Sequence, residues 1–120
     1  MKQAWINLVG EQNMLLLRAN QRAQEPVQGT SGEIDHNPVV RLHVPFTACQ
    51  WLLSEVDEDG IAFCLADFGM GCPELGSVSL EELATLDVRG LRVMRDDQWR
   101  SRMTLGQYAR LARSKGQIEP

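Results

Sequence analysis

Apolar positions along the chain predict helices near both ends and strands between them. Residues 11–24 are rich in Leu, Met, Gln, Glu and Arg, which favour a helix, and Pro26 marks its end. An apolar stripe is expected along this segment, formed by Leu8, Leu15, Ala19 and Ala23. The apolar block Met14–Leu17 extends beyond that stripe, so the helix is expected to be covered on more than one side or to contact a partner.

Further apolar segments predict the strands of a sheet. A loop at residues 25–37, which contains two glycines and a proline, separates them from the first helix. The expected strands cover residues 39–44, 48–56, 61–68, 75–78 and 91–94. The turn Asp57–Gly60 lies between two of these segments and is typical of a hairpin. If Asp57 and Gly60 pair with each other, Leu53 lies opposite Cys64. Cys49 then does not lie opposite Cys64, which disfavours a disulfide between the two cysteines.

Two capping-box patterns predict the remaining helices. Ser79 and Glu82 begin a short helix that ends near Leu86, and Thr104 and Gln107 begin a C-terminal one. The apolar positions of the C-terminal helix are Leu105, Tyr108, Ala109 and Ala112, and its stop is Gly116. These elements predict a single α+β domain over residues 1–120, in which an antiparallel sheet of about four or five strands packs with N- and C-terminal helices.

Composition and cysteine usage exclude several classes of protein. Apolar residues make up 43% of the chain and charged residues 23%, as in ordinary globular domains. No apolar run approaches the length of a membrane span. No apolar leader pattern follows Lys2, so we expect a cytoplasmic protein with no membrane partner. Three cysteines without a CxxC pair favour free thiols over a disulfide framework or a zinc site, and no cofactor is expected.

Charge is distributed unevenly along the chain. Residues 1–88 contain four basic and 13 acidic side chains, whereas residues 89–120 contain eight basic and three acidic ones. Carboxylates gather around the predicted hairpin at Glu55, Asp57, Glu58 and Asp59. Such a face suits a basic surface of a protein partner. The alternative is a solvated hairpin tip, with the two oppositely charged parts of the chain neutralising each other.

The basic C-terminal third is a candidate nucleic-acid interface. Arginine contacts phosphates, and an exposed aromatic side chain stacks on a base, most readily in single-stranded DNA. The candidate residues are Arg95, Trp99, Arg100, Arg102, Arg110 and Arg113. Tyr108 lies in the same region, but the helical pattern assigns it to the core. The acidic remainder of the chain would repel DNA.

Asp67 and Glu74 are the candidate metal ligands, because they flank a glycine-rich segment that would bring them together. Two converging carboxylates suit a divalent cation such as Mg²⁺. The alternative is that Asp67 accepts backbone hydrogen bonds from the segment Gly69–Gly71 while Glu74 is solvated. No pattern of a catalytic nucleophile with its base is present, so no catalytic residue is assigned.

The segment Asp67–Gly76 has the sequence DFGMGCPELG, and an Arg-rich end follows it. From about Pro38 to Ile118, the chain resembles a small bacterial family, domain of unknown function twenty-nine fifty-eight. The family pattern has an aromatic residue at Cys72, which argues against a catalytic role for that thiol. The resemblance implies a setting on plasmids, integrative elements or phages, beside replication, conjugation or antirestriction genes. Some relatives are labelled single-stranded DNA endonucleases; under that label Asp67 and Glu74 would hold the metal.

The sequence therefore predicts a small non-catalytic interaction protein of a mobile genetic element. It would bind a protein partner in host defence evasion or element maintenance. The alternative is a nucleic-acid-binding domain or a metal-dependent accessory domain of a single-stranded DNA nuclease. A homodimer through the helix face at Met14–Leu17 is a further expectation.

Overall fold

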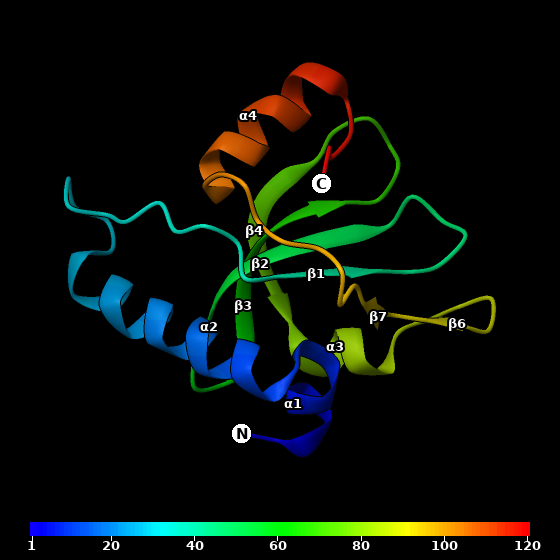
Figure 1. Ribbon diagram of the computed structural model, residues 1–120, viewed down its shortest axis with the longest axis horizontal. Helices are drawn as coiled ribbons and strands as arrows, with labels where there is room; N and C mark the ends of the chain where they lie inside the picture. Colours follow the sequence, from blue (N-terminus) through cyan, green and yellow to red (C-terminus); the bar gives the residue numbers. More distant parts are fainter.

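A five-stranded antiparallel sheet with helices on both faces forms the fold in the computed structural model, which describes all 120 residues (Figure 1). The strand order is β4-β3-β2-β1-β7, and β5 and β6 form a separate two-stranded ribbon. The strands are β1 Val40–His43, β2 Gln50–Val56, β3 Ile61–Asp67, β4 Glu74–Ser79, β5 Asp87–Val88, β6 Leu91–Arg92 and β7 Met94–Arg95. The helices are α1 Gln3–Val9, α2 Glu11–Gln24, α3 Leu80–Thr85 and α4 Leu105–Lys115, with a 3-10 turn at Glu25–Val27. The predicted α+β class is confirmed.

The N-terminal region contains one more helix than the sequence predicts. Helix α2 coincides with the predicted residues 11–24, but α1 precedes it, and Gly10 at φ 95° makes the turn between them. Helix α1 packs through Trp5, whose ring lies so close to Gly60 that a Cβ there would be 2.6 Å away. A helix of seven residues is held by such tertiary contacts rather than by its own periodicity.

The buried side of α2 differs from the predicted stripe. Met14 and Leu17 are buried, whereas Ala19 and Ala23 are exposed and Leu15 is 67% exposed. The stripe prediction was therefore wrong. The difference arises from the position of α2, which lies along the edge of β2 as well as on the sheet. Some of its polar side chains therefore point towards β2.

Polar side chains of α2 satisfy the edge of β2 where β1 no longer pairs with it. Beyond Leu53, the last β2 residue in register with β1, Arg18 donates to the carbonyl of Val56 at 2.6 Å. Asn20 donates to the carbonyl of Ser54 at 3.0 Å. These bonds replace the missing strand, because buried carbonyls need donors.

The central hairpin has the predicted register in its middle but not at its turn. Leu53 is opposite Cys64, as predicted, and all three cysteines are free. At the turn, Asp57 pairs with Ile61 rather than with Gly60, and its N–H donates to the carbonyl of Ile61 at 2.9 Å. Gly60, at φ 77°, supplies the extra loop residue that this pairing requires.

A β-bulge reconciles the turn with the middle of the hairpin. The register shifts by one residue between Leu53 and Glu55, so Ser54 is the extra residue. A one-residue shift exchanges the faces of all the following side chains. Val56 is therefore in the core, and Glu55 lies on the opposite face of the sheet, across from Phe63.

The C-terminal third contains both a correction and a confirmation. The predicted strand at 91–94 is divided: β6 pairs with β5, and β7 extends the main sheet beside β1. Val93, which lies between the two strands, is buried in the core. Helix α4 is as predicted, with a complete Thr104–Gln107 capping box. Its buried residues are Leu105, Tyr108, Ala109 and Ala112.

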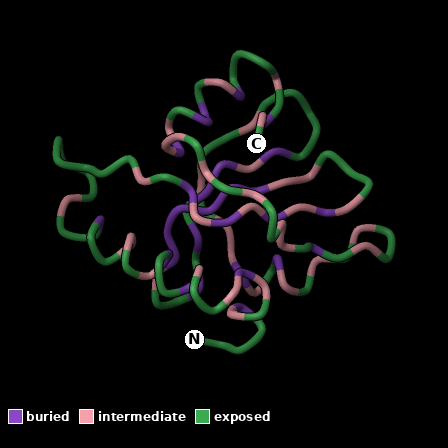
Figure 2. The backbone as a smooth tube through the Cα atoms, in the orientation of Figure 1, coloured by how far each residue is buried: buried purple, intermediate pink, exposed green.

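Two hydrophobic clusters define two faces of the sheet. We call the face covered by α1, α2 and α3 the N-terminal face, and the face on which α4 packs the C-terminal face (Figure 1). The cluster on the N-terminal face has 15 buried residues, and the cluster under α4 has seven. Buried residues are concentrated in the central strands between them (Figure 2). None of the helices has the length and apolar character that crossing a membrane requires.

Candidate partner-binding groove

Helix α4 covers only part of the C-terminal face. It packs on Leu52 and Leu65, which are fully buried. Towards the other end of the strands, Ile61, Phe63 and Leu75 are 37, 39 and 44% exposed. A groove of about 480 Å³ lies over these three side chains. The sheet therefore presents an apolar floor that no element of the chain covers.

Carboxylates form the rim of this groove. They come from the loop after α2 and from the β2–β3 hairpin, and they are Glu33, Asp35, Glu55 and Asp57. The other polar lining residues are glutamines of α2 and its following loop, and a serine of β4; no Lys, Arg or His lines the groove. The potential in the groove is therefore negative, with low-dielectric walls that strengthen it.

Backbone hydrogen bonds hold the rim carboxylates in place. Asp57 Oδ1 accepts from the N–H groups of Asp59 and Ile61, both at 2.9 Å. Asp35 Oδ1 accepts from the N–H of Gly106, also at 2.9 Å, at the first turn of α4. These contacts orient the carboxylates without neutralising them, since the donors are uncharged.

Glu55 is the most enclosed of the four. It is 9% exposed, and its Oε2 accepts one hydrogen bond, from Gln24 at 3.1 Å. Gln24 also binds the loop wall, because its amide donates to the carbonyl of Ile34 at 2.6 Å and accepts from the Ile34 N–H at 2.9 Å. The α2 terminus, the loop and Glu55 thus form one connected unit.

The structure divides the predicted acidic hairpin. Glu55 and Asp57 line the groove, whereas Glu58 and Asp59 are exposed at the hairpin tip beside it. The sequence did not identify Glu33 and Asp35, or the apolar floor. Neither acid stands in a recognisable motif, and both reach the groove through the path of the loop.

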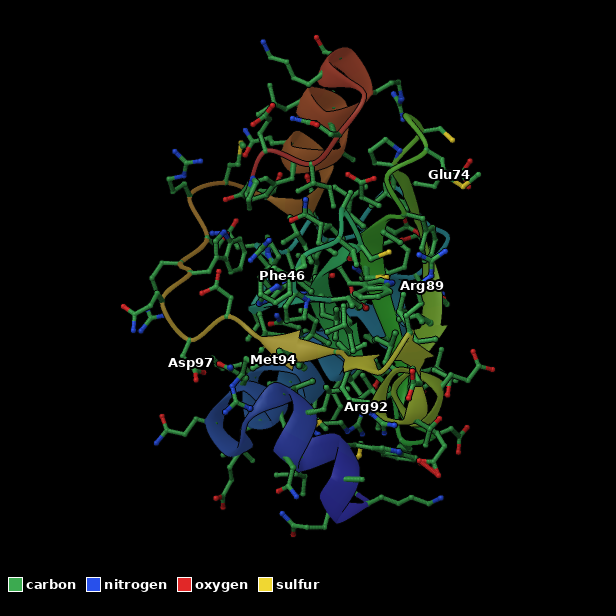
Figure 3. All side chains as sticks on the ribbon, turned by 90° about the vertical axis from the view of Figure 1, so that its right-hand side faces the viewer. Phe46, Glu74, Arg89, Arg92, Met94 and Asp97 are labelled. Atoms are coloured by element: carbon green, nitrogen blue, oxygen red, sulfur yellow. The ribbon has the colours of Figure 1, made fainter.

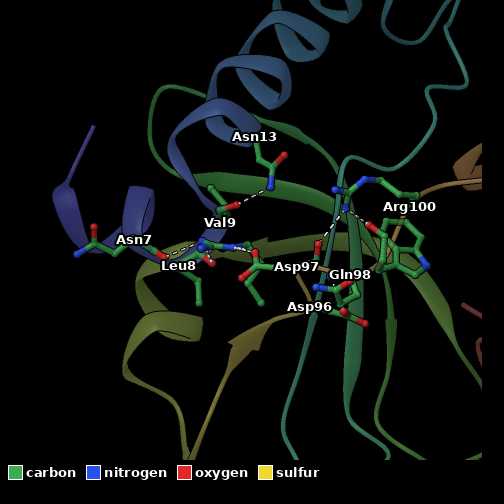
Figure 4. Close-up of polar contacts among 10 residues, drawn as sticks. Asn7, Leu8, Val9, Asn13, Asp96, Asp97, Gln98 and Arg100 are labelled. Carbon is green, nitrogen blue, oxygen red and sulfur yellow. Dashed lines mark hydrogen bonds and ion pairs between the residues drawn. The ribbon is translucent and has the colours of Figure 1, made fainter.

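Most of the predicted arginine cluster is bound to the protein's own backbone. Arg95 donates to the carbonyls of Asn7 and Leu8 and pairs with Asp97, so it closes the end of α1 (Figure 4). Arg100 donates to the carbonyls of Asp97 and Trp99. These contacts give the two guanidinium groups a structural role at the start of the loop that leads to α4.

The remaining members of the cluster are spread over the surface. Trp99 packs against Tyr108 with ring centroids 6.0 Å apart, and Arg102 donates to the carbonyl of Pro120. Only Arg110 and Arg113, on the exposed side of α4, make no hydrogen bond with their side chains. Outside this cluster, the side of the molecule that faces the viewer in Figure 3 carries two more arginines, Arg89 and Arg92. The exposed side chains of Phe46 and Met94 lie on the same side.

Asp67 and Glu74 do not share a face of the sheet. Asp67 is buried, and its two oxygens accept from the N–H of Gly69 at 2.8 Å and the N–H of Ile118 at 2.9 Å. Glu74 pairs in register with Ala66, so alternation places it opposite Asp67, and it points outward (Figure 3). No group of three or more His, Cys, Asp or Glu side chains lies close enough to hold a metal ion. The alternative expectation for Asp67, as an acceptor for the glycine-rich segment, is confirmed.

The cysteines differ strongly in their surroundings. Cys64 is buried on the N-terminal face, where burial raises the pKa of its thiol to about 12. Cys72 is exposed in the β3–β4 loop. Neither has a basic neighbour that hydrogen-bonds its sulfur, so neither is placed as a nucleophile would be.

The fold and groove define a small α+β protein with one sheet face only partly covered by a helix. The family model described as Protein of unknown function (DUF2958) matches residues 8–119, and the chain belongs to that family. The predicted resemblance is thereby confirmed, over more of the chain than the sequence motifs covered. No curated protein and no solved structure matches the chain.

Proposed function

We propose that this protein is a non-catalytic interaction protein that binds a basic segment of a protein partner in the groove on its C-terminal face. The observation that carries the proposal is the groove itself. Three partly exposed apolar side chains form its floor, four carboxylates form its rim, and no basic residue lines it. An apolar floor with a charged rim is the usual anatomy of a specific interface.

The charge of the groove selects the partner. Four carboxylates repel an anionic ligand, so phosphate or a nucleic-acid backbone does not fit there. A cationic segment gains attraction, and the apolar floor accepts an aliphatic or aromatic side chain next to the charge. Glu58 and Asp59 at the adjacent tip extend the negative surface and would accelerate encounter with such a partner.

The setting of the interaction is part of the same proposal. The resemblance noted from the sequence implies mobile genetic elements, which act against host defences and maintain themselves in the cell. We therefore expect the partner to be a bacterial protein with a basic surface, of the host or of the element. Many such proteins bind nucleic acid, and an acidic groove would compete for that basic surface.

Comparative capture from a bacterial lysate tests the proposal. The immobilised chain is compared with the groove variant Glu33→Gln/Asp57→Asn, whose two carboxylates line the rim, and with the control Glu11→Gln/Glu82→Gln, which removes the same charge elsewhere. We expect to capture a basic protein that the wild type and the control retain and that the groove variant loses. Added salt should release this protein. Equal retention by all three chains would contradict the proposal.

The nucleic-acid alternative has less structural support. Of its six predicted residues, only Arg110 and Arg113 have unengaged guanidinium groups, and Trp99 is packed against Tyr108. Titration of labelled single-stranded DNA at low salt measures this alternative directly. Salt-dependent binding that is lost in Arg110→Ala/Arg113→Ala would favour it over the groove.

A further inference from the structure

We propose that Glu55 and Phe63 together form a receptor for one arginine side chain of the partner. This inference rests on the proposed function and names the group that the groove recognises. The bulge at Ser54 is what makes the site, because it turns Glu55 out of the core to lie across from Phe63.

Glu55 is a largely enclosed carboxylate that has no cation partner, and its Oε1 is open to the groove. Its one hydrogen bond comes from the neutral amide of Gln24, and its Oε1 accepts none. The ion pairs of the protein are elsewhere: Lys2 with Glu81, Arg41 with Asp96, and Arg95 with Asp97. Buried carboxylates are normally paired, because removing them from water costs free energy that a partner must offset. The groove therefore contains an acceptor whose counter-ion is absent from this chain.

Phe63 supplies a second contact for the same cation. It is directly opposite Glu55 on the neighbouring strand, so both side chains project from the same face. Phe63 is 39% exposed and lies in the floor of the groove. A cation held by the carboxylate would lie next to Phe63, and an aromatic ring attracts a cation to its face.

The pairing of a carboxylate with an aromatic ring favours a guanidinium group over an ammonium group. A guanidinium is planar and weakly hydrated, stacks on aromatic rings and donates two parallel hydrogen bonds to one carboxylate. Asp57, two residues along the hairpin, also lines the groove and is able to accept from the remaining donors. An ammonium group would retain more of its water in this partly closed space.

Short blocked peptides test the receptor without the natural partner. Acetyl-Leu-Arg-Leu-amide is titrated into the isotope-labelled protein, and the same peptide with lysine or citrulline at the centre serves for comparison. We expect amide shifts at Ile34, Phe63 and Leu75 with the arginine peptide, smaller shifts with lysine and none with citrulline. Equal shifts with citrulline, or no shifts at the groove with arginine, would overturn the receptor.

Glu55→Gln is the decisive variant, because it removes the charge and keeps the shape. We expect it to weaken the arginine peptide about tenfold or more, whereas Glu58→Gln at the exposed tip retains binding. Its thermal unfolding midpoint should stay close to that of the wild type, since the substituted side chain can still accept the hydrogen bond from Gln24. Phe63→Leu keeps an apolar floor without the ring, and it should narrow the preference for arginine over lysine. Unchanged affinity in Glu55→Gln, or a midpoint that falls with it, would contradict this role.

The same variants separate this inference from the proposed function. If Glu33→Gln/Asp57→Asn loses the captured lysate protein and Glu55→Gln retains it, the receptor is wrong and the proposed function stands. If neither variant loses the protein, the proposed function itself fails.

Discussion

The two faces of the sheet are covered to different extents. On the N-terminal face, three helices enclose a cluster of 15 buried residues. On the C-terminal face, one helix encloses seven, and an acidic groove continues where the helix ends. The first face has the dense packing that stabilises a domain of this size. The second retains partly exposed apolar side chains next to carboxylates that form no ion pair, and the proposed partner would cover this surface.

The largest effect that distinguishes the faces should come from the N-terminal core. Leu53→Ala removes a fully buried side chain from the middle of this cluster. We expect the free energy of unfolding, measured by urea denaturation, to fall by about 2–5 kcal/mol. Leu15→Ala, on the exposed side of α2, is the matched control and should change it by less than about 0.5 kcal/mol. If both variants lose less than about 0.5 kcal/mol of unfolding free energy, the cluster on the N-terminal face does not provide the main stabilisation.

The contact between Asp67 and the C-terminal segment should rank second. The Asp67 carboxylate accepts two backbone N–H groups, one of them from Ile118, whose side chain packs under α4. Asp67→Asn places an amide donor against one of these donors and should cost about 1.5–3 kcal/mol. Hydrogen exchange at the Ile118 amide should accelerate beyond the change in global stability. If the Ile118 amide remains as protected as in the wild type, the hydrogen bond to Asp67 does not hold the C-terminal segment in place.

A change in the groove floor should affect binding more than stability. Leu75→Ser replaces a side chain that is 44% exposed in the free protein. We expect less than about 1 kcal/mol of lost unfolding free energy, because little apolar area is newly exposed. Retention of the captured partner should nevertheless fall. Leu15→Ser, outside the groove, should leave retention unchanged. If Leu75→Ser destabilises the protein as much as Leu53→Ala, the floor belongs to the core rather than to an interface.

The same contrast explains which features the sequence predicts. Local patterns predicted α2 and α4 almost to the residue and paired Leu53 with Cys64, because periodicity and turn chemistry act over short distances. The groove depends on longer connections. Its rim depends on a hydrogen bond between Asp35 and Gly106, which are far apart in the sequence. The orientation of Glu55 depends on the bulge at Ser54, which no turn residue in the sequence indicates.

The predicted sites follow the same rule. The hairpin acids were found because they are adjacent in sequence, and the structure brings two of them into the groove. The arginine cluster was also adjacent in sequence, yet Arg95 and Arg100 are bound to nearby carbonyls. A run of like charges in sequence does not specify whether the side chains meet solvent or backbone, because both satisfy their donors.

The smallest effect should be a dependence of stability on pH that arises on the C-terminal face. Burial, and then the positive charge of Arg41, lower the pKa of His43 below its ordinary 6.5, although Asp96 opposes them. Between that lowered pKa and 6.5, the unfolded chain binds more protons than the folded one, so stability rises with pH and is lost on acidification. Hydrogen bonds from Lys2 and Trp5 lower the pKa of Glu81, so its stabilising contribution is present above about pH 4.5 and is lost only below that value. We therefore expect the thermal midpoint to fall from pH 7.5 to 5.5, and His43→Gln to reduce that fall. His36→Gln serves as the control and should leave the pH dependence of the thermal midpoint unchanged. If His36→Gln reduces this dependence and His43→Gln does not, the prediction for His43 is wrong.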